Sequence, residues 1–231
     1  NSKKYETIPG SEKLIILNSL RENTPIIKNS ECTVHDIGDG VMCLEFLSKS
    51  NSIGEGIGRG LIESIQKAEE EDWNGVVIGN NAKQFSVGAN LMNLGMMATQ
   101  KQFKPLEELV NNFQQIMMKI KTSKIPVVTA AQGYVFGGGC EIAMHSDAGI
   151  YASESYIGLV EVGVGLLPGG GGTKEFALRA SDDFFEGDVK TPTLINYFKT
   201  IATATVSTSA HEGYNLNYLK KNKDFICMNT P

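Results

Sequence analysis

The sequence predicts an α/β domain in which parallel strands are joined by crossover helices. Short, continuous apolar runs, which suit buried parallel strands, alternate with longer amphipathic segments of helical period. Glycine-rich segments follow several of these runs, as is typical of turns from a strand into a helix. With 231 residues, 41% of them hydrophobic, the chain suffices for one large α/β domain or two small ones.

The first predicted elements are a hairpin, a helix and a buried strand. Residues 33–37 and 41–46 have the composition of two strands around the turn Gly38–Gly40. Residues 54–71 repeat apolar side chains at helical spacing and predict an amphipathic helix. The apolar run at residues 75–79 predicts a strand buried on both faces.

The same alternation continues in the middle of the chain. Residues 105–121 predict a second amphipathic helix, and residues 126–131 predict a second buried strand. Residues 133–139 are interpreted as a glycine-rich turn that leads into a third helix, and residues 148–151 as a further strand. This order of strands and helices implies parallel strands with helical crossovers.

Residues 1–30 show no clear periodicity and are predicted to be a linker or extension, which leaves residues 31–231 as the folded domain. The chain lacks an initiator Met, so we expect a piece of a longer polypeptide. The N-terminus has no signal-peptide core, and no apolar stretch reaches the roughly 18 residues of a membrane span. A membrane partner is therefore not expected.

The charge and the metal-binding residue types exclude further classes. The net charge of −5 argues against a nucleic-acid binder that neutralises phosphates. The four cysteines show no CxxC spacing and are expected to be free thiols in a reducing cytoplasm. With only three histidines, no metal site is expected.

A strand-to-helix turn at residues 133–139 is followed directly by Glu141. Helix N-termini present unpaired N–H groups and a positive dipole end, and glycine allows a ligand oxygen to approach them closely. Phosphate and a thioester oxygen that gains negative charge are both possible ligands. The segment matches neither a P-loop nor a dinucleotide fingerprint, and Glu141 is alternatively an ordinary acidic residue at a helix start.

Glu161 is the only charged residue in the apolar run 157–163. A lone charge in such a run is costly to bury unless it is paired or functional. An exposed glutamate in a turn is the structural alternative.

Three segments together resemble the crotonase, or enoyl-CoA hydratase/isomerase, superfamily. Phe85–Leu91 is similar to the family pattern Phe-x-x-Gly-Ala-Asp-Leu, Gly133–Glu141 to Gly-x-x-x-Gly-Gly-Gly-x-Glu, and Leu166–Thr173 to Pro-Gly-x-Gly-Gly-Thr. The resemblance runs from about Thr33 to Thr173, and weakly on to Asn229. It implies a spiral of repeated ββα units with two roughly perpendicular sheets flanked by helices, usually assembled as trimers.

The resemblance also implies a set of site residues. Glu141 and Glu161 match the two catalytic glutamates, and the amides of Ala89 and Gly138 match an oxyanion hole for the thioester carbonyl. Gly169 matches a residue whose N–H positions the attacking water. The resemblance further implies contacts with substrate or coenzyme A, which enters only as part of the substrate, from these residues: Lys83, Ser86, Val87, Gly88, Asn90, Leu91 and Gly137.

Some features depart from the family pattern. Asn90 stands where Asp is usual, and residues 181–207 are longer than the corresponding family segment. This extended form resembles the hydratase-like domain that is fused to a 3-hydroxyacyl-CoA dehydrogenase in multifunctional β-oxidation proteins. The chain also ends at Pro231, before the family's C-terminal helices, so it is expected to be truncated there.

Hydration of 2-enoyl-CoA is the leading hypothesis, because members with other activities often lack one of the two glutamates. A Δ3,Δ2-enoyl-CoA isomerase needs a single base, which Glu161 matches. A non-catalytic CoA-binding or assembly domain of a dehydrogenase is a further alternative. RNA binding is disfavoured by the acidic balance.

Overall fold

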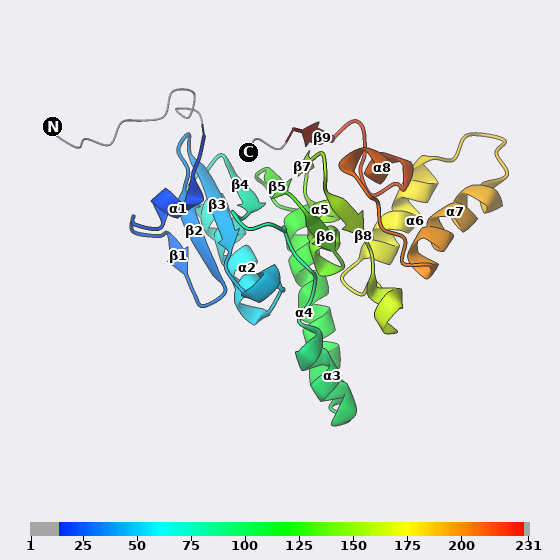
Figure 1. The fold of residues 1–231 in the computed structure, drawn as a ribbon, viewed down its shortest axis with the longest axis horizontal. Helices are drawn as coiled ribbons and strands as arrows, with labels where there is room; N and C mark the ends of the chain where they lie inside the picture. Colours follow the sequence, from blue (N-terminus) through cyan, green and yellow to red (C-terminus); the bar gives the residue numbers. More distant parts are fainter. Residues whose placement is uncertain (1–13, 229–231) are drawn as a thin grey trace.

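The computed structural model describes residues 14–228, and it contains two β-sheets (Figure 1). The larger sheet has the strand order β1-β2-β3-β4-β5-β7-β9; β1, β2 and β3 pair antiparallel, and the later strands pair parallel. The smaller sheet is the parallel pair β6–β8. The strands are β1 (Ile27–Lys28), β2 (Cys32–Asp36), β3 (Val41–Phe46), β4 (Gly75–Gly79), β5 (Val127–Ala131), β6 (Tyr134–Phe136), β7 (Ala148–Ala152), β8 (Tyr156–Gly158) and β9 (Asp224–Cys227).

Helices flank these sheets, and the α3–α4 pair extends away from the body of the molecule (Figure 1). The α-helices are α1 (Leu17–Leu20), α2 (Glu55–Glu70), α3 (Leu91–Thr99), α4 (Phe103–Lys121), α5 (Gly138–His145), α6 (Gly172–Asp182), α7 (Lys190–Ala202) and α8 (Ala210–Asn215). Two short 3-10 helices are η1 (Lys49–Asn51) and η2 (Glu161–Val164). Among residues 14–228, no helix is long and apolar enough to cross a membrane.

The predicted α/β class with two sheets flanked by helices is confirmed. The hairpin β2–β3, helices α2 and α4, and strands β4, β5 and β7 lie where their apolar patterns predict them. The hairpin turns at Gly38, Asp39 and Gly40, all of which have positive φ. Glycine adopts this backbone conformation at little cost, which explains the composition of the turn.

The interpretation of residues 133–139 as a turn alone was wrong, because β6 lies inside this range. Its three residues pair in register with β8, from Tyr134 with Tyr156 to Phe136 with Gly158. Only Val135 of β6 is fully buried, so the run lacks the continuous hydrophobicity of the larger strands. This small sheet places the start of α5 beside the chain that leads into η2.

Part of the predicted extension 1–30 packs with the domain. Strand β1 pairs with β2, and the guanidinium of Arg21 donates to the buried carboxylate of Glu45 at 2.6 Å. Glu45 also lies 3.0 Å from the Nε2 atom of buried His35. The boundary at residue 31 stays a prediction, and residues 1–13 and 229–231 of the predicted ranges lie outside the described residues.

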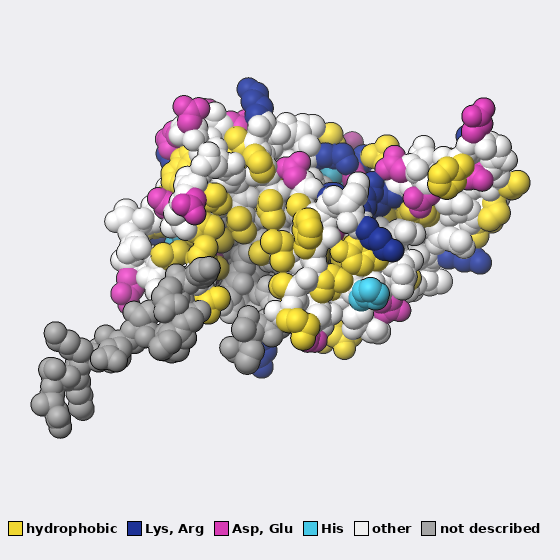
Figure 2. Space-filling model, turned by 90° about the horizontal axis from the view of Figure 1, so that it is seen from above, with side chains coloured by type: hydrophobic (Ala, Val, Ile, Leu, Met, Phe, Trp, Pro, Cys, Tyr) yellow, Lys and Arg dark blue, Asp and Glu magenta, His cyan; other side chains and the backbone are white. Residues whose placement is uncertain are grey.

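One face of the molecule leaves apolar side chains uncovered. Hydrophobic side chains gather near the middle of the face seen in Figure 2. In the main sheet, Ile150 of β7 pairs with Phe225 of β9, and these residues are 43% and 59% exposed. Exposed apolar groups of this kind are typical of surfaces that contact another protein segment.

Candidate active site

Two glycine-containing loops meet at the N-terminus of α5. A Cβ atom placed on Gly88 would lie 3.2 Å from the amide nitrogen of Gly138, and one placed on Gly138 would lie 3.5 Å from the amide nitrogen of Ala89. A parallel bridge between Ser86 and Val135 holds the two loops together. Gly88 and Gly137 have positive φ, so larger residues would be strained here as well as crowded.

The amide nitrogens of Ala89 and Gly138 lie on these adjoining loops, and both are unpaired in the described part of the chain. Within residues 14–228, neither N–H donates to a backbone or side-chain acceptor. Gly138 is the first residue of α5, where the helix dipole adds positive potential. Two unpaired amides at such a point are suited to hold an oxygen that gains negative charge.

Glu141 lies in the first turn of α5 and is 2% exposed. Its Oε1 atom accepts a hydrogen bond of 2.9 Å from the amide of Gly172, at the N-terminus of α6. Burial raises the pKa of Glu141 to about 6, against the lowering effect of the amides of Gly170, Gly171 and Gly172. The carboxyl group is therefore mainly ionised at neutral pH.

Glu161 begins η2, and its side chain lies against the turn before α5. A Cβ atom on Gly137 would lie 3.3 Å from Oε1 of Glu161. The Oε2 atom of Glu161 is buried and has no hydrogen-bond partner among residues 14–228. Burial and then the negative charge of Glu141 raise the pKa of Glu161 to about 8. At neutral pH this group is therefore mainly protonated, next to an ionised neighbour.

Helix α4 supplies two contacts to the site that the sequence did not indicate as functional. The ring of Phe113 packs against both glycine segments: Cβ atoms placed on Gly138 and Gly170 would lie 2.9 Å and 2.5 Å from it. Gln114 donates a 2.7 Å hydrogen bond to the carbonyl of Gly169. The helical period of α4 predicted Phe113 as a core residue, but nothing local indicated which loop it would meet.

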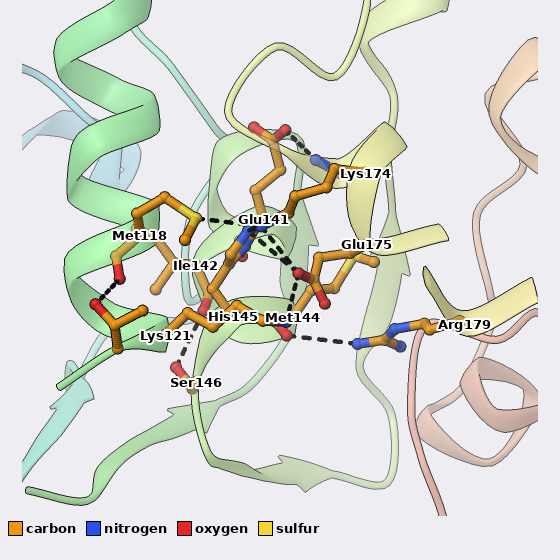
Figure 3. Close-up of polar contacts among 12 residues, drawn as sticks. Met118, Lys121, Glu141, Ile142, Met144, His145, Ser146, Lys174, Glu175 and Arg179 are labelled. Atoms are coloured by element: carbon orange, nitrogen blue, oxygen red, sulfur yellow. Dashed lines mark hydrogen bonds and ion pairs between the residues drawn. The ribbon is translucent and has the colours of Figure 1, made fainter. Parts of the chain in front are cut away.

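The segment after Glu141 carries a buried polar cluster, shown in Figure 3. The Nδ1 atom of His145 lies 2.7 Å from the carbonyl oxygen of Glu141, and its Nε2 atom lies 2.9 Å from Nζ of Lys174. Glu175, which is 4% exposed, accepts from Lys121 at 2.6 Å. The spacing of His145 one turn after Glu141 was the only sign of this cluster in the sequence.

The other residues predicted to bind substrate or coenzyme A differ in their solvent exposure and in their hydrogen bonds. Ser86 is fully buried, and its hydroxyl donates to the carbonyl of Asn51 and accepts from the amide of Gly88. Its side chain therefore shapes the loop, and a contact of Ser86 with substrate or coenzyme A stays a prediction. Asn90 caps α3 by accepting from the amide of Met92.

Besides Asn90, three predicted binding residues are exposed, and all four stay predictions: Lys83, Val87 and Leu91 are the others. For Gly169, the carbonyl is fixed by Gln114, and within residues 14–228 its N–H donates to no partner. No group of three or more His, Cys, Asp or Glu side chains among the described residues is arranged to hold a metal ion.

Comparison with known proteins identifies the family to which the sequence belongs. Residues 37–183 match the enoyl-CoA hydratase/isomerase family. The chain belongs to this family. The matched range of this family member contains Glu141 and Glu161, and it contains the unpaired amides of Ala89 and Gly138.

Two curated relatives have names from fatty-acid oxidation. The family member is 43% identical over 225 residues to the probable 3-hydroxyacyl-CoA dehydrogenase of Bacillus subtilis, covering 94% of this chain and 27% of that protein. It is 30% identical to a putative fatty acid oxidation complex trifunctional enzyme of Rickettsia felis, covering 79% of this chain and 25% of that protein. The chain thus spans about a quarter of the length of these relatives.

Solved structures share the fold of this family member. An enoyl-CoA hydratase from Geobacillus kaustophilus has a TM-score of 0.70 at 22% identity, covering 87% of this chain and 70% of that one. The enoyl-CoA hydratase from Bacillus anthracis has a TM-score of 0.67 at 20% identity, covering 86% and 70%. At these identities the similarity establishes the crotonase-type fold alone.

Proposed function

We propose that the chain catalyses the hydration of 2-enoyl-CoA thioesters as an enoyl-CoA hydratase. One observation supports this proposal above all: two neighbouring glutamates, buried Glu141 and half-buried Glu161, have pKa values on opposite sides of neutrality, beside two unpaired amides. Addition of water to a conjugated double bond needs a base, an acid and a site for the negative charge that develops on the carbonyl oxygen. The family membership makes the CoA thioester the appropriate substrate class.

In the proposed reaction, the N–H groups of Ala89 and Gly138 bind the thioester carbonyl oxygen. Charge accumulates on this oxygen as water adds to C3, and the two amides stabilise the enolate-like transition state. Loss of one such donor typically costs about 2.7–4 kcal/mol of transition-state stabilisation. Because the donors belong to the backbone, their side chains need only be small, as Ala and Gly are.

Glu141 and Glu161 divide the proton transfers in this proposal. Ionised Glu141 takes a proton from water while the water oxygen forms a bond to C3. Protonated Glu161 gives its proton to C2, which has received the electron pair of the double bond. Because both acids lie on the same side of the substrate in this arrangement, the addition is syn. Each cycle ends with Glu141 protonated and Glu161 ionised. Proton transfer between the two carboxyl groups, or through solvent, then restores the starting state.

Crotonyl-CoA hydration by the purified chain tests the assignment. We expect Glu141→Gln and Glu161→Gln each to lower kcat by about 10²–10⁴-fold, the usual contribution of a general acid or base. Glu154→Gln, which changes an exposed glutamate, is the control and should keep the wild-type rate. Activity in both active-site variants would contradict the proposal. Absence of activity in the folded wild-type chain would favour a non-catalytic CoA-binding domain, and product analysis with 3-enoyl-CoA would detect isomerisation.

We also propose that the chain acts beside a 3-hydroxyacyl-CoA dehydrogenase activity, fused or associated, or as a homotrimer. The names of the longer relatives and the exposed pair Ile150 and Phe225 support a protein partner. Light scattering of the chain alone measures its mass directly: a trimer would triple the mass of 25.0 kDa. A cytoplasmic location stays a prediction from cysteine usage.

A further inference from the structure

Glu141 depends on a second helix for the geometry of its carboxylate. The amide of Gly172 holds its Oε1 atom, and a Cβ atom on Gly170 would lie 2.7 Å from its Oε2 atom. These contacts come from the N-terminus of α6 and the residues just before it. A shift of α6 relative to α5 would therefore move the hydrogen-bond donors away from the carboxylate.

His145 joins the two helices one turn beyond Glu141. Lysine ammonium groups only donate hydrogen bonds, so Nε2 of His145 accepts from Lys174, and Nδ1 carries the proton that it donates to the carbonyl of Glu141. Burial lowers the pKa of His145 to about 4, which keeps the ring neutral in this tautomer. The ring also packs on Gly171, where a Cβ atom would lie 2.9 Å from Nε2.

Glu175 keeps Lys174 in place. Its Oε1 atom lies 3.0 Å from Nζ of Lys174, 2.6 Å from Nζ of Lys121 and 3.6 Å from Nε2 of His145. Burial acts to raise the pKa of Glu175, but hydrogen bonds from the two lysines more than offset it and lower the value. A charged carboxylate thus anchors α4 and α6 around the imidazole of α5 (Figure 3).

We propose that His145 and Lys174 are positioning residues that hold α6 against α5 and keep the amides of Gly170–Gly172 on the carboxylate of Glu141. This inference deepens the proposed function and rests on it for the role of Glu141 as base. Neither residue touches the reacting atoms. Lys174 has a second effect, since its positive charge favours the ionised form of Glu141. The other charged groups that face this region are Glu161 from η2, Glu175 from α6 and Lys121 from α4.

The direct test is the titration of the Glu141 carboxyl group, followed by carbon NMR of chain labelled at glutamate Cδ and assigned with Glu141→Gln. Lys174→Met removes the charge and the contact with His145 at a position whose side chain is 39% exposed, so folding should persist. We expect the pKa of Glu141 to rise by about 0.5 or more. The acidic limb of the pH profile of kcat/KM should move by the same amount.

Lys119→Met is the matched control, because Lys119 is likewise a partly exposed lysine in an ion pair, but it lies on α4 and pairs with Glu69 at 2.7 Å, in a different cluster. It should leave the titration of Glu141 unchanged. His145→Gln retains an acceptor and a donor and should preserve most of the wild-type titration, whereas His145→Leu should raise the pKa of Glu141. A titration unaffected by Lys174→Met would overturn the proposal, even with full hydratase activity. A shifted titration in a chain that hydrates no enoyl-CoA would sustain the positioning role and refute the proposed reaction.

Discussion

Glu141 and Glu161 are electrostatically coupled, but only Glu141 is hydrogen bonded by the N-terminus of a helix. The amide of Gly172 donates to Glu141, while Oε2 of Glu161 has no partner among residues 14–228. Burial raises both pKa values, but the helix amides limit that of Glu141 to about 6, whereas the charge of Glu141 helps to raise that of Glu161 to about 8. The pair is therefore prepared for one base and one acid at neutral pH.

The first prediction concerns the pH dependence of hydration. The base must be ionised and the acid protonated, so kcat/KM should rise through a pKa of about 6 and fall through one of about 8. We expect a bell-shaped profile with its maximum near pH 7. In Glu161→Gln the residual activity should lose the alkaline limb. Initial rates with crotonyl-CoA between pH 5 and 9.5 measure this, and a wild-type rate independent of pH would contradict it.

The second prediction concerns the effect of Glu161 on stability. Its folded-state pKa of about 8 lies above the ordinary glutamate value of 4.5, so its contribution to stability is fully present below pH 4.5 and is lost as pH rises through 8. Glu161→Gln keeps the shape without the charge and should raise Tm relative to wild type at pH 9, with little difference at pH 4.5. Calorimetry at the two pH values measures the change. A variant less stable than wild type at pH 9 would show that Glu161 is well solvated when ionised.

The third prediction tests the two free amides. Gly138→Ala places a methyl group 2.9 Å from the ring of Phe113 and 3.5 Å from the amide of Ala89. We expect a loss in kcat of about 10²–10³-fold, the typical cost of one oxyanion-hole donor. Gly95→Ala in α3 is the control, because a Cβ atom there meets nothing within 4 Å. Equal rates for Gly138→Ala and wild type would place the thioester carbonyl elsewhere.

The fourth prediction concerns the N-terminal part of the domain. Arg21→Met leaves the fully buried carboxylate of Glu45 with His35 as its remaining partner. Breaking a buried ion pair by removing one partner typically costs about 3–5 kcal/mol; the 44% exposure of Arg21 reduces this to an expected ~1–2 kcal/mol. Arg59→Met removes an exposed pair with Glu63 and should change stability by less than about 0.5 kcal/mol. Urea denaturation compares the two, and equal midpoints would show that residue 21 is dispensable.

The elements with a strong local pattern were predictable from the sequence. The period of 3.6 in α2 and the continuous apolar runs of β4 and β5 reflect burial of whole faces, which leaves a clear record in residue order. Strands β6 and β8 have three residues each, and their pairing joins segments about twenty residues apart, so no local pattern marks them. Helices α7 and α8 were also not predicted. Helix α7 exposes the apolar side chains of Leu194, Ile195 and Phe198, so its sequence does not separate an apolar face from a polar one. Helix α8 has only six residues.

The candidate site was predictable only in part. Resemblance indicated Glu141, Glu161, Ala89 and Gly138, and the structure brings these residues to one place. The sequence did not indicate that Ser86 is buried, since a serine two residues before a glycine has the composition of an exposed turn. Nor did it indicate that Lys174 and Glu175 reach His145, because that contact depends on how α5 and α6 pack.

The parallel pairing of β6 with β8 limits how this protein can be altered. The register pairs Phe136 with Gly158. Phe136 lies two residues before the start of α5, and Gly158 lies three residues before Glu161. Inserting or deleting a single residue in either strand would turn the following side chains to the opposite face. Loop grafting or length variation should therefore be directed to the surface segment around Gly187, where an added Cβ atom meets nothing within 4 Å. There the acid pair would keep its spacing whatever sequence is introduced.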